Sequence, residues 1–236
     1  MEEIVEGFMF GDIHTKEYSM SLKDRQAPTP EENVITEEVP FMQGSYDFSM
    51  ILGERIFKNR TLSYRFEVEE RSYQHRKVDE IVLKNWLMKK GWGRLYDDHD
   101  DGYYYWAKCT SVTVEDDHVF GRLSISISFE AYPFMVADLE EGHDIWDEFY
   151  FDLDYSQPNE FEVSGSSSIN LMNVGSVGVV PTIIASSQMA IIKNGATYTV
   201  PAGESKSESF RLEIGENAMT INGTGTIKFI FYKELL

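Results

Sequence analysis

The acidic run from Asp97 to Asp101 is the stretch of this chain whose residue types come nearest to a metal site. It reads Asp-Asp-His-Asp-Asp and is followed by Gly102. A calcium loop of the EF-hand kind needs oxygen ligands at positions 1, 3 and 5, glycine at 6 and glutamate at 12. Counted from Asp97, position 3 is His99 and position 12 is Lys108. The pattern fails twice, so a solvated turn is the simpler interpretation and a bound cation is the alternative.

Other residue types that could do chemistry are present without the spacing that chemistry requires. The five histidines (14, 75, 99, 118 and 143) form no His-x-x-x-His or His-x-His pair, so a zinc site is not expected. The single cysteine, Cys109, can form neither an internal disulfide nor a Cys-based zinc site. It lies in the middle of a predicted strand, where a small buried apolar residue is expected.

Carboxylates are abundant between Asp138 and Glu162, where ten acidic residues occur without a Lys or Arg. A glycosidase pair could be drawn from this set, but some pair always fits such a density, so the pattern favours a charged surface or a domain boundary. A Gly-x-Ser-x-Gly elbow and a phosphate-binding glycine loop are missing from the sequence. The sequence predicts no enzyme, no metal and no cofactor.

Aromatic side chains are the remaining candidates for binding. Trp146, Tyr150 and Tyr198 could stack on sugars if they lie exposed on a β-sandwich, but core packing is the better explanation for most of them. A carbohydrate-binding protein is therefore the alternative function.

Composition excludes several classes of partner. The chain has 236 residues, 42% of them hydrophobic, and its 40 acidic against 21 basic residues give a net charge of −19. An acidic surface disfavours binding to nucleic acid or to an anionic membrane. The sequence shows no apolar run of transmembrane length, and Met-Glu-Glu-Ile-Val-Glu does not resemble a signal peptide. We expect a soluble protein made in a cytoplasm.

The elements that would position these residues are mainly strands. Residues 61–69 alternate cleanly, with Leu62, Tyr64, Phe66 and Val68 on one face. Strands are also expected at Tyr103–Val114 and Phe120–Phe129, joined by a turn over Glu115–His118. One helix is expected at about 77–90: Asp79 and Glu80 would occupy its first turn, Lys89 and Lys90 its last, and Gly91 its end. Val78, Ile81, Val82 and Trp86 form an apolar stripe along it.

An arm precedes the first of these strands. Residues 39–48 contain Pro40 and Gly44, too broken for a helix, and carry apolar side chains that need a cover from the protein itself or from a neighbour. The preceding connector, residues 26–38, contains glutamates 31, 32, 37 and 38 and two prolines. It is expected to be mobile unless a partner orders it.

The C-terminal part is predicted to consist of strands with frequent turns, as in a β-sandwich. A strand is expected at Trp146–Tyr155. Asn194-Gly195 predicts a type I′ hairpin, Pro201–Gly203 predicts the next turn, and Asn222-Gly223 is expected to introduce a terminal strand, Thr226–Tyr232. Phe210–Ile214 alternates as another strand would.

Five pieces of the sequence, in order across residues 7–134, resemble the distal tail protein family of long-tailed (siphovirus-type) bacteriophages. They are Gly7-Phe-Met-Phe-Gly, Val39-Pro-Phe-Met-Gln-Gly-Ser-Tyr with the strand Leu62–Val68, Asn85-Trp-Leu, Tyr103-Tyr-Tyr-Trp-Ala-Lys, and Ser126-Ile-Ser-Phe-Glu-Ala-Tyr-Pro-Phe. The C-terminal match is weaker. The resemblance implies a mainly β, two-domain protein. Its parts would be an N-terminal β-sandwich or split-barrel ring domain (1–134), an acidic linker (135–145) and a C-terminal galectin-like β-sandwich (146–236).

The resemblance also implies a structural role in the virion, at the tip of a phage tail assembled in the host cytoplasm. Six copies would form a ring that joins the tail tube protein to the tail-tip and receptor-binding proteins, with no membrane insertion and no specific nucleic-acid binding. DNA would pass through the ring, whose carboxylates would repel the DNA backbone. Pro40, Phe41, Met42, Gly44 and Tyr46 on the arm are the expected contacts between copies.

Overall fold

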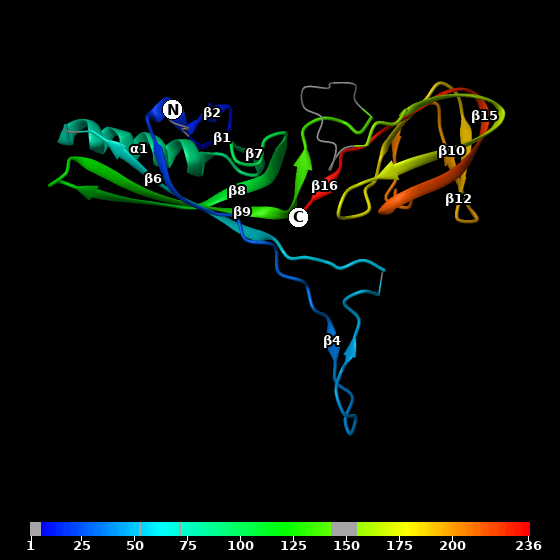
Figure 1. The fold of residues 1–236 in the computed structure, drawn as a ribbon, viewed down its shortest axis with the longest axis horizontal. Helices are drawn as coiled ribbons and strands as arrows, with labels where there is room; N and C mark the ends of the chain where they lie inside the picture. Colours follow the sequence, from blue (N-terminus) through cyan, green and yellow to red (C-terminus); the bar gives the residue numbers. More distant parts are fainter. Residues whose placement is uncertain (1–5, 52, 71, 143–154) are drawn as a thin grey trace. The chain divides into compact units, whose positions relative to one another are not determined.

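Two compact units make up the protein, shown in Figure 1, where the chain is coloured from blue to red. The computed structural model describes residues 6–51, 53–70, 72–142 and 155–236. Unit 1 contains the described residues up to Met135 together with Leu236, and unit 2 is Val136–Leu235. Both are mainly β, as expected, and the described residues include one α-helix, in unit 1. Over those same ranges no helix has the length and apolarity to cross a membrane.

Unit 1 is organised around one sheet with the strand order β2-β1-β7-β8-β9-β6-β3. The strands are β1 (Phe8–Phe10), β2 (Ile13–His14), β3 (Ser21–Gln26), β6 (Arg60–Glu69), β7 (Gly93–Asp97), β8 (Tyr103–Asp117) and β9 (Arg122–Ala137). A short 3₁₀ helix, η1 (Thr15–Tyr18), follows β2, and two further strands, β4 (Thr36–Glu37) and β5 (Tyr46–Asp47), pair with each other outside this sheet.

The expected alternation in β6 is confirmed. Leu62, Tyr64, Phe66 and Val68 are all buried, and their cross-strand partners on β9 are the apolar residues of that strand. The rings of Phe8 and Phe66 lie 5.6 Å apart in an edge-on arrangement that aromatic pairs favour. This apolar face of the sheet is the core of unit 1.

The helix α1 (Tyr73–Lys89) begins four residues earlier than expected. Ser72 is its N-cap and accepts a hydrogen bond from the backbone N–H of His75 at 3.4 Å. Asp79 and Glu80 therefore lie beyond the first turn, and their predicted role at the positive end of the helix dipole is wrong. Lys89 does occupy the last turn, as predicted.

Three of the four residues of the apolar stripe predicted for α1 face the solvent. Val78 and Ile81 are 56% and 61% exposed and Val82 is 38% exposed, whereas Leu83 and Leu87 are fully buried against the sheet. Trp86 is half-buried, and its Nε1 donates to the backbone carbonyl of Phe10 at 2.8 Å. The helix has apolar residues on both sides, and the core takes the side with the two leucines.

Cys109 lies in β8 and is buried, as expected. Burial raises the pKa of its thiol to about 11, and the thiolate is the form that reacts with thiol reagents. We expect the native protein at pH 8 to react with a disulfide reagent at least about 100-fold more slowly than the urea-unfolded chain. A colourimetric thiol assay measures both rates, and a fast native reaction would contradict this burial.

The described residues of unit 2 form one sheet of six strands, in which β15 pairs with three others. The strands of the sheet are β10 (Glu160–Asn173), β11 (Thr182–Ala185), β12 (Met189–Lys193), β13 (Ala196–Val200), β14 (Gly203–Lys206) and β15 (Gly215–Ile230); β16 (Glu234–Leu235) follows near the C-terminus. β10 runs antiparallel to β15 along its whole length, while β12 and β11 pair with successive parts of the other edge of β15. The buried residues of these strands form the core of unit 2.

The two Asn-Gly pairs of unit 2 have different outcomes. Asn194 and Gly195 have φ values of 52° and 80° and join β12 to β13, so the predicted type I′ turn is confirmed. Asn222-Gly223 is not a turn: it lies inside β15. At Gly223 a side chain would meet Met189 Cγ at 2.7 Å, so this glycine serves close packing instead of a reversal.

Two further strands were predicted in this part of the chain. Phe210–Ile214 is not a strand. It contributes one bridge, Leu212 to Val179, and buries Phe210 and Leu212 in the core. Of the predicted strand Trp146–Tyr155, all but Tyr155 lies outside the described residues, as do Trp146 and Tyr150. Residues 143–145 of the expected linker lie outside them as well.

Candidate functional site

A two-stranded arm, residues 31–58, connects β3 to β6 and carries all five predicted contact residues (Figure 1). Its two halves pair near the base and again toward the tip: Glu32 bridges Phe57, the backbone N–H of Phe48 donates to the carbonyl of Ile35 at 2.8 Å, and β4 pairs with β5. Residues 31–38 of the acidic connector therefore form the outgoing half of the arm.

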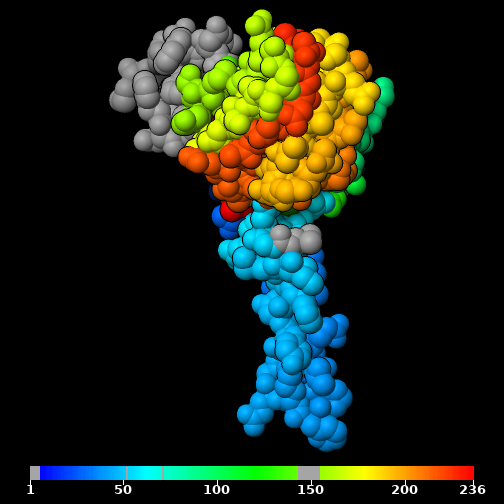
Figure 2. All heavy atoms as spheres, turned by 90° about the vertical axis from the view of Figure 1, so that its right-hand side faces the viewer, coloured from blue at the N-terminus to red at the C-terminus, as the bar shows by residue number. Residues whose placement is uncertain are grey.

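The arm has few apolar side chains buried along it. Val34, Tyr46, Met50 and Ile51 are 61%, 55%, 56% and 70% exposed, and Figure 2 shows the arm as a narrow blue column. Its order rests on backbone pairing and a few polar contacts, such as the buried Ser49, whose Oγ accepts from the backbone N–H of Ile35 at 2.8 Å. A two-stranded hairpin of this kind is marginally stable alone in water, so the arm suits a surface that a partner covers.

The tip of the arm is a tight turn from Val39 to Met42. The N–H of Met42 donates to the carbonyl of Val39 at 3.0 Å, which places Pro40 and Phe41 at the two central positions. Phe41 has a φ of 70°, in the left-handed region that suits glycine at this position of a type II turn. A bulky residue there costs on the order of 1–3 kcal/mol.

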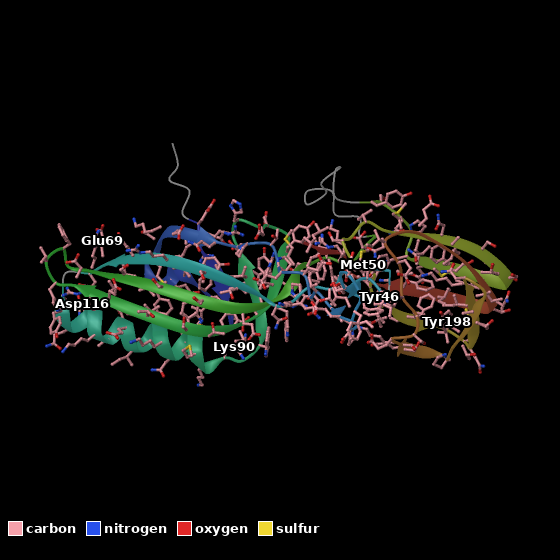
Figure 3. The ribbon with its side chains drawn as sticks, turned by 90° about the horizontal axis from the view of Figure 1, so that it is seen from below. Tyr46, Met50, Glu69, Lys90, Asp116 and Tyr198 are labelled. Carbon is pink, nitrogen blue, oxygen red and sulfur yellow. The ribbon has the colours of Figure 1, made fainter. Side chains whose placement is uncertain are left out.

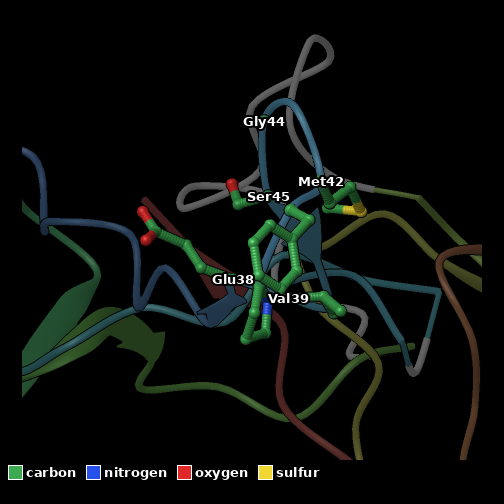
Figure 4. Close-up of a pocket in the computed structure, with 7 residues that line it drawn as sticks. Glu38, Val39, Met42, Gly44 and Ser45 are labelled. Carbon is green, nitrogen blue, oxygen red and sulfur yellow. The ribbon is translucent and has the colours of Figure 1, made fainter.

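Phe41 is also fully exposed, at 108% of its reference area. The backbone of Phe41 is thus strained, while its aromatic side chain makes no core contact. The tip residues enclose a shallow hollow of about 500 Å³, seen in Figure 4 with Val39, Met42 and Gly44 around it. Strain at an exposed apolar tip points to an interaction role for this turn.

The structure brings the five predicted residues together on one hairpin tip. Pro40, Phe41, Gly44 and Tyr46 are exposed and Met42 is half-buried. Val34, Ile35, Met50 and Ile51 on the arm were missed. The signal for them was present, because each is an apolar residue in a segment otherwise rich in Glu and Ser.

The acidic run at Asp97–Asp101 is a network of structural contacts. Asp97 is 3% exposed, and its Oδ2 accepts from Arg25 Nε at 2.8 Å and from the Tyr64 hydroxyl at 2.7 Å. Asp100 accepts from the Tyr105 hydroxyl at 2.7 Å and also pairs with Arg25. Burial, with the charge of Asp97 next, raises the pKa of Tyr64 well above its usual value, so this phenol stays a donor.

The next residue of the run is equally engaged. Asp98 pairs with Lys16 at 2.8 Å and His14 at 2.9 Å and accepts from the backbone N–H of Gly7. The partners of Asp98 hold its pKa below the usual value despite partial burial. Among the described residues, no group of three or more His, Cys, Asp or Glu is arranged to hold a metal ion. The carboxylates that a cation would need are already bound to cationic side chains and hydroxyls.

Tyr198 is the candidate for sugar stacking that the structure describes; it is half-buried and packs against the core of unit 2. Its ring lies 5.1 Å from that of Phe210 in an edge-on contact and it belongs to the periphery of the core. One side of this ring is therefore occupied by protein. Core packing, the simpler of the two interpretations weighed for these aromatics, holds for this one.

Comparison with known proteins places the fold. No protein-family model matches the chain, and no curated protein matches it in sequence. Among solved structures it is similar to the Dit protein of phage SPP1, described as a paradigm of the hub adsorption apparatus in phages that infect Gram-positive bacteria. The TM-score is 0.70 with 12% identity, over 98% of this chain and 100% of the other.

A chain of the activated phage p2 baseplate is a more distant neighbour, with a TM-score of 0.41 and 10% identity over 98% of each chain. The similarity to the SPP1 protein extends over both units, including the arm. The chain therefore has the fold of a phage distal tail protein.

Proposed function

We propose that this protein is a structural subunit of the ring at the distal end of a phage tail, where it joins the tail tube to the tail-tip and receptor-binding proteins. The observation that carries the proposal is a fold shared with a tail hub protein over nearly the whole of both chains. A ring of six copies gives the arm a partner, because a head-to-tail contact repeated around a closed ring covers one arm per subunit.

The charge of the chain supports the same role. A net charge of −19 disfavours attachment to DNA, and a ring through which a genome passes needs a wall that does not hold the phosphate backbone. In this proposal the protein is a scaffold and no enzyme. It acts through the surfaces by which it contacts other proteins, and the exposed arm is one of them.

The mass of the protein in solution tests this proposal. Light scattering at several concentrations is expected to show a species close to six times the chain mass of 27.2 kDa. Negative-stain images of that species are expected to show closed rings with a central hole. A monomer at every concentration up to the millimolar range would contradict the ring.

A further inference from the structure

A hollow on unit 1 has the chemistry to receive the tip of the arm. It has a volume of about 400 Å³ and is formed by the loop after α1 and the outer faces of β1, β7 and β8. Lys90, Trp92, Arg94, Tyr96 and Trp106 line it, and we call these five residues the socket. A pocket of this size accommodates an aromatic side chain with its neighbours.

The walls of the socket are exposed aromatic rings. Trp92 and Trp106 are 38% and 45% exposed, and the Nζ of Lys108 lies 5.5 Å above the ring of Trp92. The guanidinium of Arg94 lies 4.5 Å above the ring of Tyr104, and its Nη1 donates to the Tyr96 hydroxyl at 3.1 Å. Aromatic residues and arginine are the types enriched where proteins bind each other.

The cations of the socket are held in place. The stem of Lys90 lies against two glycines: a Cβ at Gly11 would meet Lys90 Cδ at 2.9 Å, and one at Gly93 would meet Cε at 3.0 Å. The Nζ of Lys90 lies 5.7 Å from the ring of Phe10, and among the described residues no carboxylate forms an ion pair with it. One acid, Asp12, also lines the hollow. In a chain with 40 acidic residues, such a site favours an acidic partner.

The arm presents the complementary chemistry. Glu37 and Glu38 directly precede the apolar turn Val39–Met42 and are exposed, and the described residues give neither of them a cationic partner. The other two glutamates of the arm are already paired, Glu31 with Lys58 and Glu32 with Arg55. The tip is thus an aromatic ring with two available carboxylates beside it.

We propose that the arm of one subunit inserts Phe41 into the socket of a second copy of this chain, where Glu37 and Glu38 of the arm pair with Lys90 and Arg94. This inference rests on the proposed ring. Figure 3 shows Lys90 well apart from Tyr46 and Met50 of the same chain, so tip and socket are separate patches of one unit. A contact between two different patches repeats head to tail, and such a contact builds rings.

A charge swap tests the pairing. Lys90→Glu with Arg94→Glu, and separately Glu37→Lys with Glu38→Lys, are each expected to weaken association of the full-length chain about tenfold or more in light scattering. The chain that carries all four changes is expected to regain association. Lys77→Glu with Lys206→Glu, two exposed lysines outside the socket, is the control with matched charge and is expected to leave the ring intact.

Cross-linking provides the second measurement. Phe41→Cys and Trp92→Cys in one chain are expected to form disulfide-linked oligomers under mild oxidation, while either change alone gives none, because Cys109 is buried. Rings that survive both charge reversals and give no cross-link would overturn the arm-socket pairing and leave the proposed ring standing. A wild-type chain without any ring would overturn both.

Discussion

Replacement of Phe41 by glycine is expected to abolish the ring and leave the fold of the subunit unchanged. The two effects separate because the backbone and the side chain of this residue have opposite requirements. Its φ of 70° suits glycine, so the change relieves strain in the turn. The aromatic side chain of Phe41 is fully exposed, so the change removes no core packing. Loss of an aromatic residue at the centre of a contact costs about 2–4 kcal/mol, or roughly 30-fold to 1000-fold in each contact.

Light scattering measures the association of this variant, and thermal unfolding measures its stability, which we expect to stay within about 0.5 kcal/mol of the wild type. Phe120→Gly is the matched control, because Phe120 is another phenylalanine at a hairpin turn and is 72% exposed. The Phe120 variant is expected to assemble into the ring of subunits as the wild type does. Normal assembly of the Phe41 variant would show that the strained aromatic has no role between copies.

Asp97→Ala is expected to destabilise unit 1 by about 3–5 kcal/mol, the typical cost of removing one partner of a buried ion pair. The change leaves the Arg25 guanidinium, whose side chain is 19% exposed, without one of its two carboxylate partners, and it leaves the Tyr64 hydroxyl without its acceptor. In a domain of marginal stability this loss is sufficient to unfold most of the unit.

Urea unfolding followed by hydrogen exchange in individual peptides distinguishes the two units, and unit 2 is expected to keep its protection. Asp101→Ala is the control within the same acidic run. Among the described residues, the Asp101 Oδ1 accepts only from the adjacent Gly102 N–H, so a change within about 0.5 kcal/mol is expected. A calcium-dependent rise in stability that disappears in the Asp97 variant would instead favour a cation site.

The alternation of β6 and β9 could be read from the sequence because a strand with one buried face has a local signature. Leu62 to Val68 and Leu123 to Phe129 carry that signature, and the sheet pairs them directly. The hairpin at Asn194-Gly195 was equally readable, since its turn residues have a specific conformational role. In these two places the local signature and the long-range contacts agree, and the predictions are confirmed.

The failures arose where the decisive contact is distant in sequence. Asn222-Gly223 looks like Asn194-Gly195, and only the approach of Met189 decides that Gly223 belongs inside a strand. The helix has apolar residues on two sides, and packing against the sheet selects Leu83 and Leu87. The positive φ of Phe41 could not be predicted from the sequence either, because glycine, and not phenylalanine, is the residue type that favours this conformation.

The acidic run illustrates the same limit for sites. Its composition suggested a cation, whereas Arg25, 72 residues earlier in the chain, pairs with Asp97, the first carboxylate of the run. The socket was not foreseen for the same reason, because the contact that lays Lys90 against Gly11 joins positions about 80 residues apart.

The position of the arm between β3 and β6 has a consequence for how such proteins diverge. These two strands are antiparallel neighbours, so the arm is topologically a long hairpin loop whose ends are already held together by the sheet. Doubling the length of a closed loop adds only about 0.6 kcal/mol to the cost of closing it. Insertions, deletions or exchange of the arm therefore leave the sheet nearly undisturbed, and related chains are free to vary its length and tip to match new neighbours while they keep one scaffold.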